Sequence, residues 1–158
     1  MASNLKSLSD YSGSNIGDIS DKKFALIVAE WNSQVTDSLY SGAYATLLNH
    51  GAVKQNIITA YVPGSYELPF GAQKAAASDD IDAVICLGCV IQGETKHFDF
   101  ICSAVAHGLI DVSLKFDKPV VFGVLTPDTL QQALDRSGGK HGNKGDEAAI
   151  TAIKMLSL

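Results

Sequence analysis

The sequence has few cysteines and no long apolar run, and both absences limit what the chain can be. Among 158 residues there are three cysteines. They lie in apolar contexts, which suits buried, reduced thiols better than disulfides. No apolar run approaches the roughly 20 residues needed to cross a bilayer, so we expect no membrane segment. The first residues lack the charged region, apolar core and cleavage site of a secretory signal. The expected compartment is therefore the cytoplasm.

Positive charge is also scarce. The 12 Lys and Arg residues face 17 Asp and Glu, for a net charge of −5. Without a basic stripe to displace counterions, the chain is not expected to bind nucleic acid. Arg136 is the sole arginine and lies with Lys140 and Lys144 in one cationic patch. Its guanidinium is well matched to phosphate oxygens, although a solvated basic loop is the alternative.

The sequence contains no convincing motif for binding a metal or a nucleotide. Cys86 and Cys89 have CxxC spacing, but residues three apart in a strand point to opposite faces, so a joint metal site would need a sharp bend at Gly88. The glycines of 138–145 do not follow an apolar strand, and no Lys-Ser or Lys-Thr pair occurs. Neither a Walker loop nor a dinucleotide fingerprint is therefore present.

What the sequence does contain is a repeated strand-then-helix pattern. Short apolar runs predict four strands, and apolar residues at helical spacing predict the segments between them as helices. Asn32 or Ser33 is expected to cap the first helix, and Pro127 to occupy the first position of the fourth. The predicted strands are 24–29, 57–62, 82–87 and 120–125, and the helices are 34–50, 67–77, one of about 17 residues that carries an apolar stripe from Ile101 to Phe116, 128–136 and 145–157.

Four such units imply a parallel sheet with right-handed crossovers and helices on both faces. The expected fold class is α/β, a flavodoxin-like three-layer sandwich around a central four-stranded parallel sheet. Residues 1–21 are rich in Ser, Asn, Gly and Asp, which predicts a flexible N-terminal arm before a single domain of residues 22–158. This arm is a candidate to add to a neighbour's sheet.

Ligands of such sheets bind beyond the carboxyl ends of the strands. The most polar of the four loops there is 88–99, whose first ten residues include two glycines, a carboxylate, a hydroxyl, a lysine and a histidine. Because histidine titrates near neutral pH, His97 is a candidate for proton transfer. Glu94 and Thr95 precede a helix whose exposed N–H groups favour an anion. The alternatives are a surface histidine and ordinary helix caps.

The loops after the first two predicted strands offer further candidates. Trp31 could stack on a planar ring, although a core tryptophan is the commoner explanation. Residues 62–67 bring backbone donors, a hydroxyl and a carboxylate that suit a polyol or an amide edge, or form only a turn and cap. His50 and His107 lie within helical patterns and are expected to be structural.

Several segments taken together resemble one family, the 6,7-dimethyl-8-ribityllumazine synthases. The similarity runs over about residues 13 to 157 in the family's order. The segments that carry it are Ser41-Gly-Ala, Val62-Pro-Gly-Ser-Tyr-Glu-Leu-Pro, Leu87-Gly-Cys-Val-Ile-Gln-Gly-Glu-Thr-Lys-His-Phe-Asp, Val121-Phe-Gly-Val-Leu-Thr and Gly142-Asn-Lys-Gly-Asp-Glu-Ala-Ala.

The resemblance implies a reaction and a place for each substrate. The family condenses 5-amino-6-(D-ribitylamino)uracil with 3,4-dihydroxy-2-butanone 4-phosphate, releasing phosphate and water, without a metal or an organic cofactor. The step is the penultimate one of riboflavin biosynthesis. By the resemblance, Trp31 stacks on the pyrimidinedione and His97 transfers protons. The remaining matches in this half of the site are Ser65, Tyr66 and Glu67 for the ribityl chain and ring, Cys89, Val90 and Ile91 for the uracil edge through their backbone, and Glu94 and Thr95 for the butanone phosphate.

The resemblance also implies an assembly. Phe122, Arg136 and Lys144 match positions that reach across from the adjacent subunit, with Arg136 on the phosphate. Family members form pentamers, and the short connection 137–145 favours the hollow shell of 60 subunits. Riboflavin synthase is a candidate partner.

Three positions depart from the family's usual residues. Trp31 and Tyr66 stand where phenylalanine is frequent, and Gln92 stands where a basic residue is common, so substrate affinity is left open. Three other functions are also left open: an archaeal-type riboflavin synthase, a non-catalytic flavin-binding module of flavodoxin type, and a purely structural shell protein.

Overall fold

A parallel four-stranded sheet forms the centre of the molecule. The computed structural model describes residues 17–158. Its strands pair in the order β2-β1-β3-β4, and every pairing is parallel. The expected α/β class and central sheet are therefore confirmed. The strands are β1 (Phe24–Ala29), β2 (Ile57–Val62), β3 (Ala83–Cys89) and β4 (Val120–Leu125).

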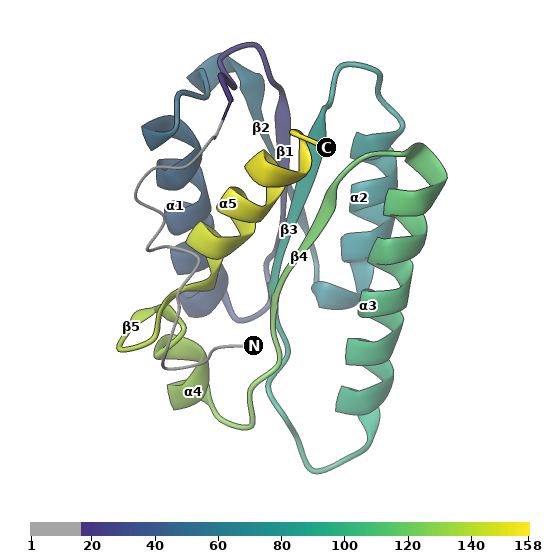
Figure 1. Ribbon diagram of the computed structural model, residues 1–158. Helices are drawn as coiled ribbons and strands as arrows, with labels where there is room; N and C mark the ends of the chain where they lie inside the picture. Colours follow the sequence, from purple (N-terminus) through teal and green to yellow (C-terminus); the bar gives the residue numbers. More distant parts are fainter. Residues whose placement is uncertain (1–16) are drawn as a thin grey trace.

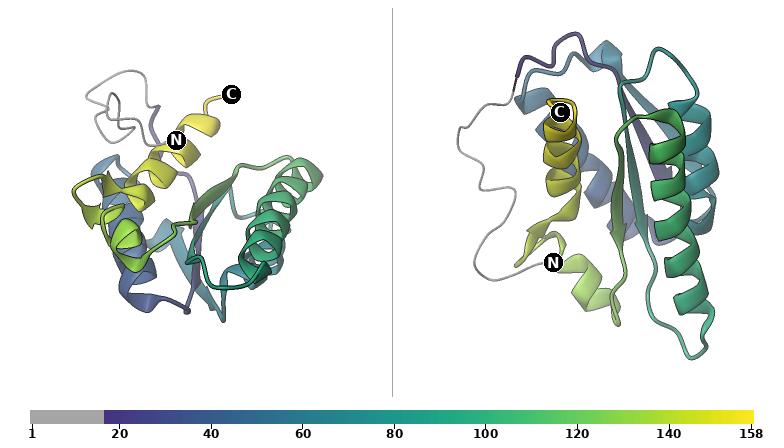
Figure 2. Two further views of the ribbon diagram at one scale, coloured as in Figure 1. Left: turned by 90° about the horizontal axis from the view of Figure 1, so that it is seen from below. Right: turned by 45° about the vertical axis from the view of Figure 1, so that its right-hand side comes forward.

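Helices cover both faces of this sheet, which gives three layers (Figures 1 and 2). Helices α1 (Ser33–Asn49) and α5 (Lys144–Met155) lie on one face, and α2 (Leu68–Ala76) and α3 (His97–Phe116) on the other. Alternate residues of β1 enter two separate apolar clusters, Phe24 and Leu26 on the α1 face and Ala25 and Ile27 on the α2 face. Burial on both faces explains why β1 and β3 are continuously apolar.

The predicted bounds of β1, β2 and β4 are confirmed, whereas β3 is longer than predicted at its carboxyl end. Gly88 and Cys89 pair with Val124 and Leu125 of β4, so the strand continues to Cys89. Because α3 begins at His97, the polar loop is confined to residues 90–96.

The starts of two helices differ from expectation in different degrees. Asn32, one of the two expected caps, is the N-cap residue of α1, but its backbone is left-handed and its side chain makes no capping bond. Pro127 does not begin a helix, because α4 (Leu130–Leu134) starts later and is capped by Thr129, whose Oγ1 accepts the N–H of Gln132 at 3.2 Å.

Four further short elements were not predicted as such. A hairpin of β5 (Ser137–Gly139) and β6 (Gly142–Asn143) joins α4 to α5. Short 3₁₀ turns η2 (Lys54–Asn56) and η3 (Ser65–Glu67) precede β2 and α2.

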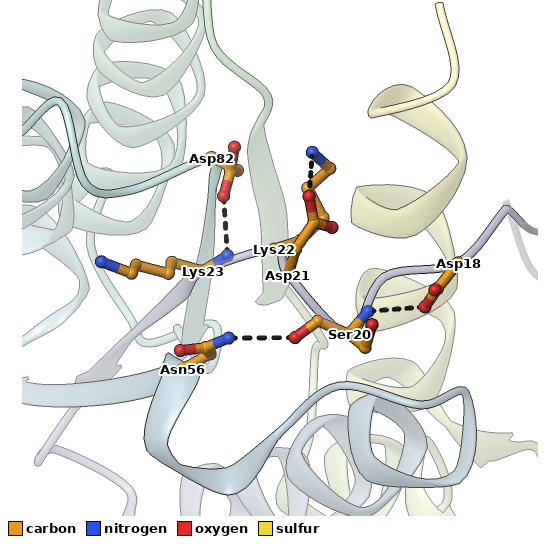
Figure 3. Close-up of polar contacts among 7 residues, drawn as sticks. All are labelled: Asp18, Ser20, Asp21, Lys22, Lys23, Asn56 and Asp82. Carbon is orange, nitrogen blue, oxygen red and sulfur yellow. Dashed lines mark hydrogen bonds and ion pairs between the residues drawn. The ribbon is translucent and has the colours of Figure 1, made fainter.

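The predicted N-terminal arm, 1–21, is only partly described. Residues 1–16, with the proposed addition to a neighbour's sheet, lie outside the described residues. Residue Ile19 is buried in the core on the α1 face. The carbonyl of Ser20 accepts a hydrogen bond from Asn56 Nδ2 at 3.1 Å, and the N–H of Lys23 donates to Asp82 at 2.7 Å (Figure 3). The packed core therefore already includes Ile19, and the division into an arm and a domain stays a prediction.

Candidate functional site

Backbone hydrogen bonds extend the sheet beyond its strands and fix the loops at the carboxyl ends, at the bottom of Figure 1. The N–H of Glu30 donates to Val62 O at 2.8 Å, and that of Trp31 to Pro63 O at 3.1 Å. On the other side, the N–H of Val90 donates to Leu125 O at 2.8 Å and that of Gln92 to Pro127 O at 2.9 Å. The loops therefore start from defined positions rather than as free chain.

A cavity of about 660 Å³ lies among the loops after β1, β2 and β3. This volume is in the range of small-molecule sites. Most of the residues predicted for the pyrimidine substrate, together with His97, line this one cavity. Its lining consists of Trp31, Asn32, Gly64, Ser65, Tyr66, Glu67, Cys89, Val90, Ile91, His97 and Ile101.

Two aromatic side chains stand open at this cavity. Trp31 is 73% exposed and Tyr66 is 58% exposed. The commoner explanation of Trp31, a core tryptophan, is therefore wrong. An exposed indole beside a cavity leaves a face on which a planar ring can stack.

Ser65 and Gly88 pack closely at the wall of the cavity. Ser65 is buried, and its Oγ has no hydrogen-bond partner among residues 17–158. A Cβ placed on Gly88 would lie 2.6 Å from this oxygen. Only a glycine in β3 leaves room for the η3 turn to sit against the strand, and this turn carries Tyr66 and Glu67 to the cavity.

The cysteines contribute little thiolate chemistry. Cys89 packs in the cluster on the α1 face and Cys86 in the cluster on the α2 face, so the prediction that CxxC points to opposite faces is confirmed. Burial, with a smaller effect of Cys102, raises the pKa of Cys89 to about 11. Burial also raises the pKa of Cys86. No cluster of three or more metal-ligating side chains occurs among the described residues.

His97 is the first residue of α3 and lies exposed on the cavity's rim. Its backbone N–H donates to Thr95 Oγ1 at 3.3 Å. Glu94 and Thr95 are exposed and do not line the cavity. Thr95 thus has a capping contact, and the role of both residues toward an anion stays a prediction.

Phe122, Arg136 and Lys144 lie away from this cavity within one chain. Arg136 and Lys144 line a second cavity of about 260 Å³ beyond the end of β4. There Arg136 donates to Gln132 O at 3.0 Å, and Lys144 pairs with Glu147 at 2.6 Å. Phe122 is 41% exposed on the edge strand β4. That these three side chains serve a neighbouring subunit remains a prediction.

Asn32, Gly64 and Ile101 line the cavity but were not predicted as site residues. Asn32 and Gly64 fall in loops that the carboxyl-end rule selects, so position was the available signal. Ile101 was assigned to the apolar stripe of its helix, and its sequence context offers no other signal.

The fold and this cavity define the class: a flavodoxin-like α/β protein with a cavity beyond the carboxyl ends of β1 and β3, where the strand order reverses and such proteins bind their ligands. Among residues 17–158, no helix is both long and apolar enough to cross a membrane.

Residues 21–158 match the model of the family described as 6,7-dimethyl-8-ribityllumazine synthase, and the chain belongs to this family.

Relatives of the same description cover nearly the whole chain. The 6,7-dimethyl-8-ribityllumazine synthase of Cytophaga hutchinsonii is 61% identical over 157 residues, 99% of this chain and 98% of the relative. That of Parabacteroides distasonis is 49% identical, covering 100% and 99%. That of Flavobacterium johnsoniae is 51% identical, covering 100% and 83%. These matches favour the synthase over a riboflavin synthase or a flavin-binding module.

Proposed function

We propose that the chain condenses 5-amino-6-(D-ribitylamino)uracil with 3,4-dihydroxy-2-butanone 4-phosphate to 6,7-dimethyl-8-ribityllumazine, releasing phosphate and water. Its place is the penultimate step of riboflavin biosynthesis. The observation that carries the proposal is a single cavity in a member of this family. It is lined by the exposed indole of Trp31, by residues 89–91 at the end of β3, and by His97. The cytoplasm remains the expected compartment, since all three cysteines are unpaired.

The pyrimidine substrate is placed between Trp31 and the end of β3. Its ring stacks on the indole, and its edge meets the backbone of Cys89, Val90 and Ile91. Three groups of this backbone have no hydrogen-bond partner among the described residues, the Val90 carbonyl and both the N–H and the carbonyl of Ile91. The register puts the Val90 carbonyl opposite Pro127, which has no N–H to donate.

The ribityl chain of this substrate binds to the η3 turn, which forms another wall of the cavity. Ser65, Tyr66 and Glu67 offer backbone groups, a phenol and a carboxylate there. A polyol needs several donors and acceptors at once, and this short segment supplies them from a fixed turn.

The second substrate and the proton transfers belong to the start of α3. Glu94 and Thr95 hold the butanone phosphate beside the helix N-terminus, and His97 transfers protons. Imine formation, phosphate elimination and ring closure need positioning and acid-base help rather than a strong nucleophile. The raised pKa of Cys89 agrees with this, because its thiol stays protonated near neutral pH.

The active unit is a homopentamer in this proposal. Phe122 and Lys144 close the pyrimidine site of the adjacent subunit, and Arg136 binds the phosphate there. Three observations support this: Phe122 is partly exposed on the edge strand β4, Arg136 and Lys144 line the cavity beyond the end of that strand, and none of the three lines the cavity beside Trp31 in its own chain. The short 137–145 connection favours assembly into a 60-subunit shell, with riboflavin synthase as a candidate partner.

The test mixes the purified chain with both substrates and follows lumazine fluorescence. We expect a large loss of rate for His97→Ala and for Arg136→Ala. His107→Ala is the matched control, because His107 is exposed on α3 and bonds only within its helix, to Ser103. No lumazine from the wild type would refute the function. An undiminished Arg136→Ala rate would reject the phosphate assignment alone.

A further inference from the structure

Asn32 has an unusual backbone conformation at the turn from β1 into α1. Its φ of 63° and ψ of 43° are left-handed, a region that asparagine tolerates better than most residues. Its carbonyl accepts the N–H groups of Val35 at 2.8 Å and Thr36 at 3.1 Å, which starts the helix. The side chain takes no part in that cap and is free to bond elsewhere.

The side chain instead reaches β3. Asn32 Nδ2 donates to the carbonyl oxygen of Cys89 at 2.9 Å, across 57 positions of sequence. Val28 pairs with Leu87 in the parallel ladder, so a longer β1 would place the Trp31 N–H on the Cys89 carbonyl. The Trp31 N–H bonds Pro63 O on the opposite side instead. The side-chain amide of Asn32 therefore takes the place of the Trp31 N–H as the hydrogen-bond donor to the Cys89 carbonyl.

This replacement lies between the two halves of the pyrimidine site. Trp31 precedes Asn32 in the chain, and Cys89 begins the 89–91 backbone; all of these residues line the same cavity. A ring stacked on the indole reaches the 89–91 edge only when the two are held at a fixed separation. Misplacement by about 1 Å is enough to lower the efficiency of a bound reactant substantially.

We propose that Asn32 is a positioning residue that sets the separation between the Trp31 ring and the 89–91 backbone, and thereby the affinity for the planar pyrimidine substrate. The role rests on the proposed function. Asn32 acts through Trp31 and Cys89. Its left-handed backbone thus serves the geometry of the site as well as the start of α1.

Two variants distinguish loss of the Asn32–Cys89 hydrogen bond from a general loss of folding. Asn32→Gly keeps the left-handed backbone without strain and removes the amide. Asn32→Asp keeps the shape and replaces the donor with an oxygen that faces the Cys89 carbonyl. Asn56→Asp is the matched control, because Asn56 makes the same kind of amide-to-carbonyl bond, to Ser20 at the amino ends of the strands (Figure 3).

The first measurement needs no turnover. Trp31 is the single tryptophan, so its fluorescence reports this loop alone. Time-resolved anisotropy should show faster local rotation of the indole in both Asn32 variants and wild-type behaviour in Asn56→Asp. Titration with the pyrimidine substrate alone, followed by quenching of Trp31, should show affinity lowered by about tenfold, the usual effect of one lost hydrogen bond.

Steady-state kinetics provide the second measurement. The KM for the pyrimidine substrate should rise by about tenfold in Asn32→Gly, while the KM for the butanone phosphate changes less than about twofold. Equal rises in both KM values, or unchanged pyrimidine affinity with unchanged anisotropy, would overturn the positioning role. A wild type that makes no lumazine overturns the proposed function; the positioning role is then decided by the binding titration and the anisotropy. If one variant does not fold, the other still decides.

Discussion

Replacing Gly88 by alanine tests whether the packing of β3 against the η3 turn shapes the cavity. The added Cβ would lie 2.6 Å from Ser65 Oγ and 2.9 Å from Leu68 Cδ1. To restore an ordinary contact, Ser65 must retreat by about 0.8 Å. Ser65 is 6% exposed and Leu68 is fully buried, so neither side chain can swing into solvent. The turn between them must shift as a unit.

The size of the effect follows from two opposing contributions. Overfilling a packed site costs about 1–3 kcal/mol. Replacing a strand glycine by alanine returns about 0.5–1 kcal/mol through lower backbone entropy of the unfolded chain. We therefore expect Gly88→Ala to lower the free energy of unfolding by about 1.3 kcal/mol, the middle of a range of about 0–2.5 kcal/mol, and the Tm by about 3–5 °C.

The same shift should change binding, because the η3 turn carries Tyr66 and Glu67 along the cavity wall. We expect the KM for the pyrimidine substrate to rise by about fivefold or more, since a displaced wall mispositions the ligand. Thermal unfolding and fluorescence kinetics on the same preparation measure both effects.

Two other glycines supply the controls. A Cβ on Gly71 would meet Ile27 Cγ2 at 2.7 Å, away from the cavity lining, so Gly71→Ala should change stability but not the pyrimidine KM. A Cβ on Gly17 would meet nothing within 4 Å, so Gly17→Ala should change neither. A destabilised Gly88→Ala with a wild-type KM would refute the link between packing and binding. A variant more stable than the wild type would refute the packing argument itself.

Three further predictions concern the assembly, a buried thiol and an ion pair. Mixing His97→Ala with Arg136→Ala subunits by joint refolding should restore part of the activity, because some sites then combine one chain's histidine with a neighbour's arginine; no recovery would place both groups in one chain. Cys89→Ala should keep the wild-type KM, and in the wild type thiol alkylation of Cys89 should be slow at pH 8 and accelerate toward its pKa of about 11. The bond to Lys140 lowers the pKa of Asp135, so this contribution to stability is present above the unfolded value and is lost as the pH falls through the folded one. Asp135→Asn should therefore lower the Tm slightly at pH 7, and this difference should shrink as the pH falls below the ordinary pKa range of an aspartate, as thermal melts across that range would show.

The elements that sequence predicts well are those determined by nearby residues. The runs 24–29, 57–62 and 120–125 are each bounded by a polar residue or a proline on both sides, and their limits are confirmed. The end of β3 is different, because Gly88 and Cys89 belong to the strand only through pairing with β4, 36 positions away. The hairpin in 137–143 has too few residues to show an alternating pattern.

The site divides in the same way. The rule that ligands bind at carboxyl ends selects the loops, and the cavity lies among three of them. The exposure of Trp31 contradicts what is common for tryptophan, because β1 turns away at that residue and leaves the indole outside the core. Asn32 was interpreted as a helix cap from its neighbours in sequence, whereas its side chain bonds a carbonyl 57 positions away.

The end of β3 shows why such a site is hard to recognise from local sequence. On the β1 side, the ladder donor is withdrawn and the Asn32 side chain takes its place. On the β4 side, the position that would donate to the Val90 carbonyl is Pro127, and no donor replaces it among the described residues. The missing hydrogen bond to the Cys89 carbonyl is replaced by the Asn32 amide, whereas the missing bond to the Val90 carbonyl is not replaced. The end of β3 is therefore held in place while the Val90 carbonyl can accept a hydrogen bond from a ligand. Asparagine after a strand and proline after another are common in any α/β protein. Only the register that aligns both with β3 turns them into parts of one site.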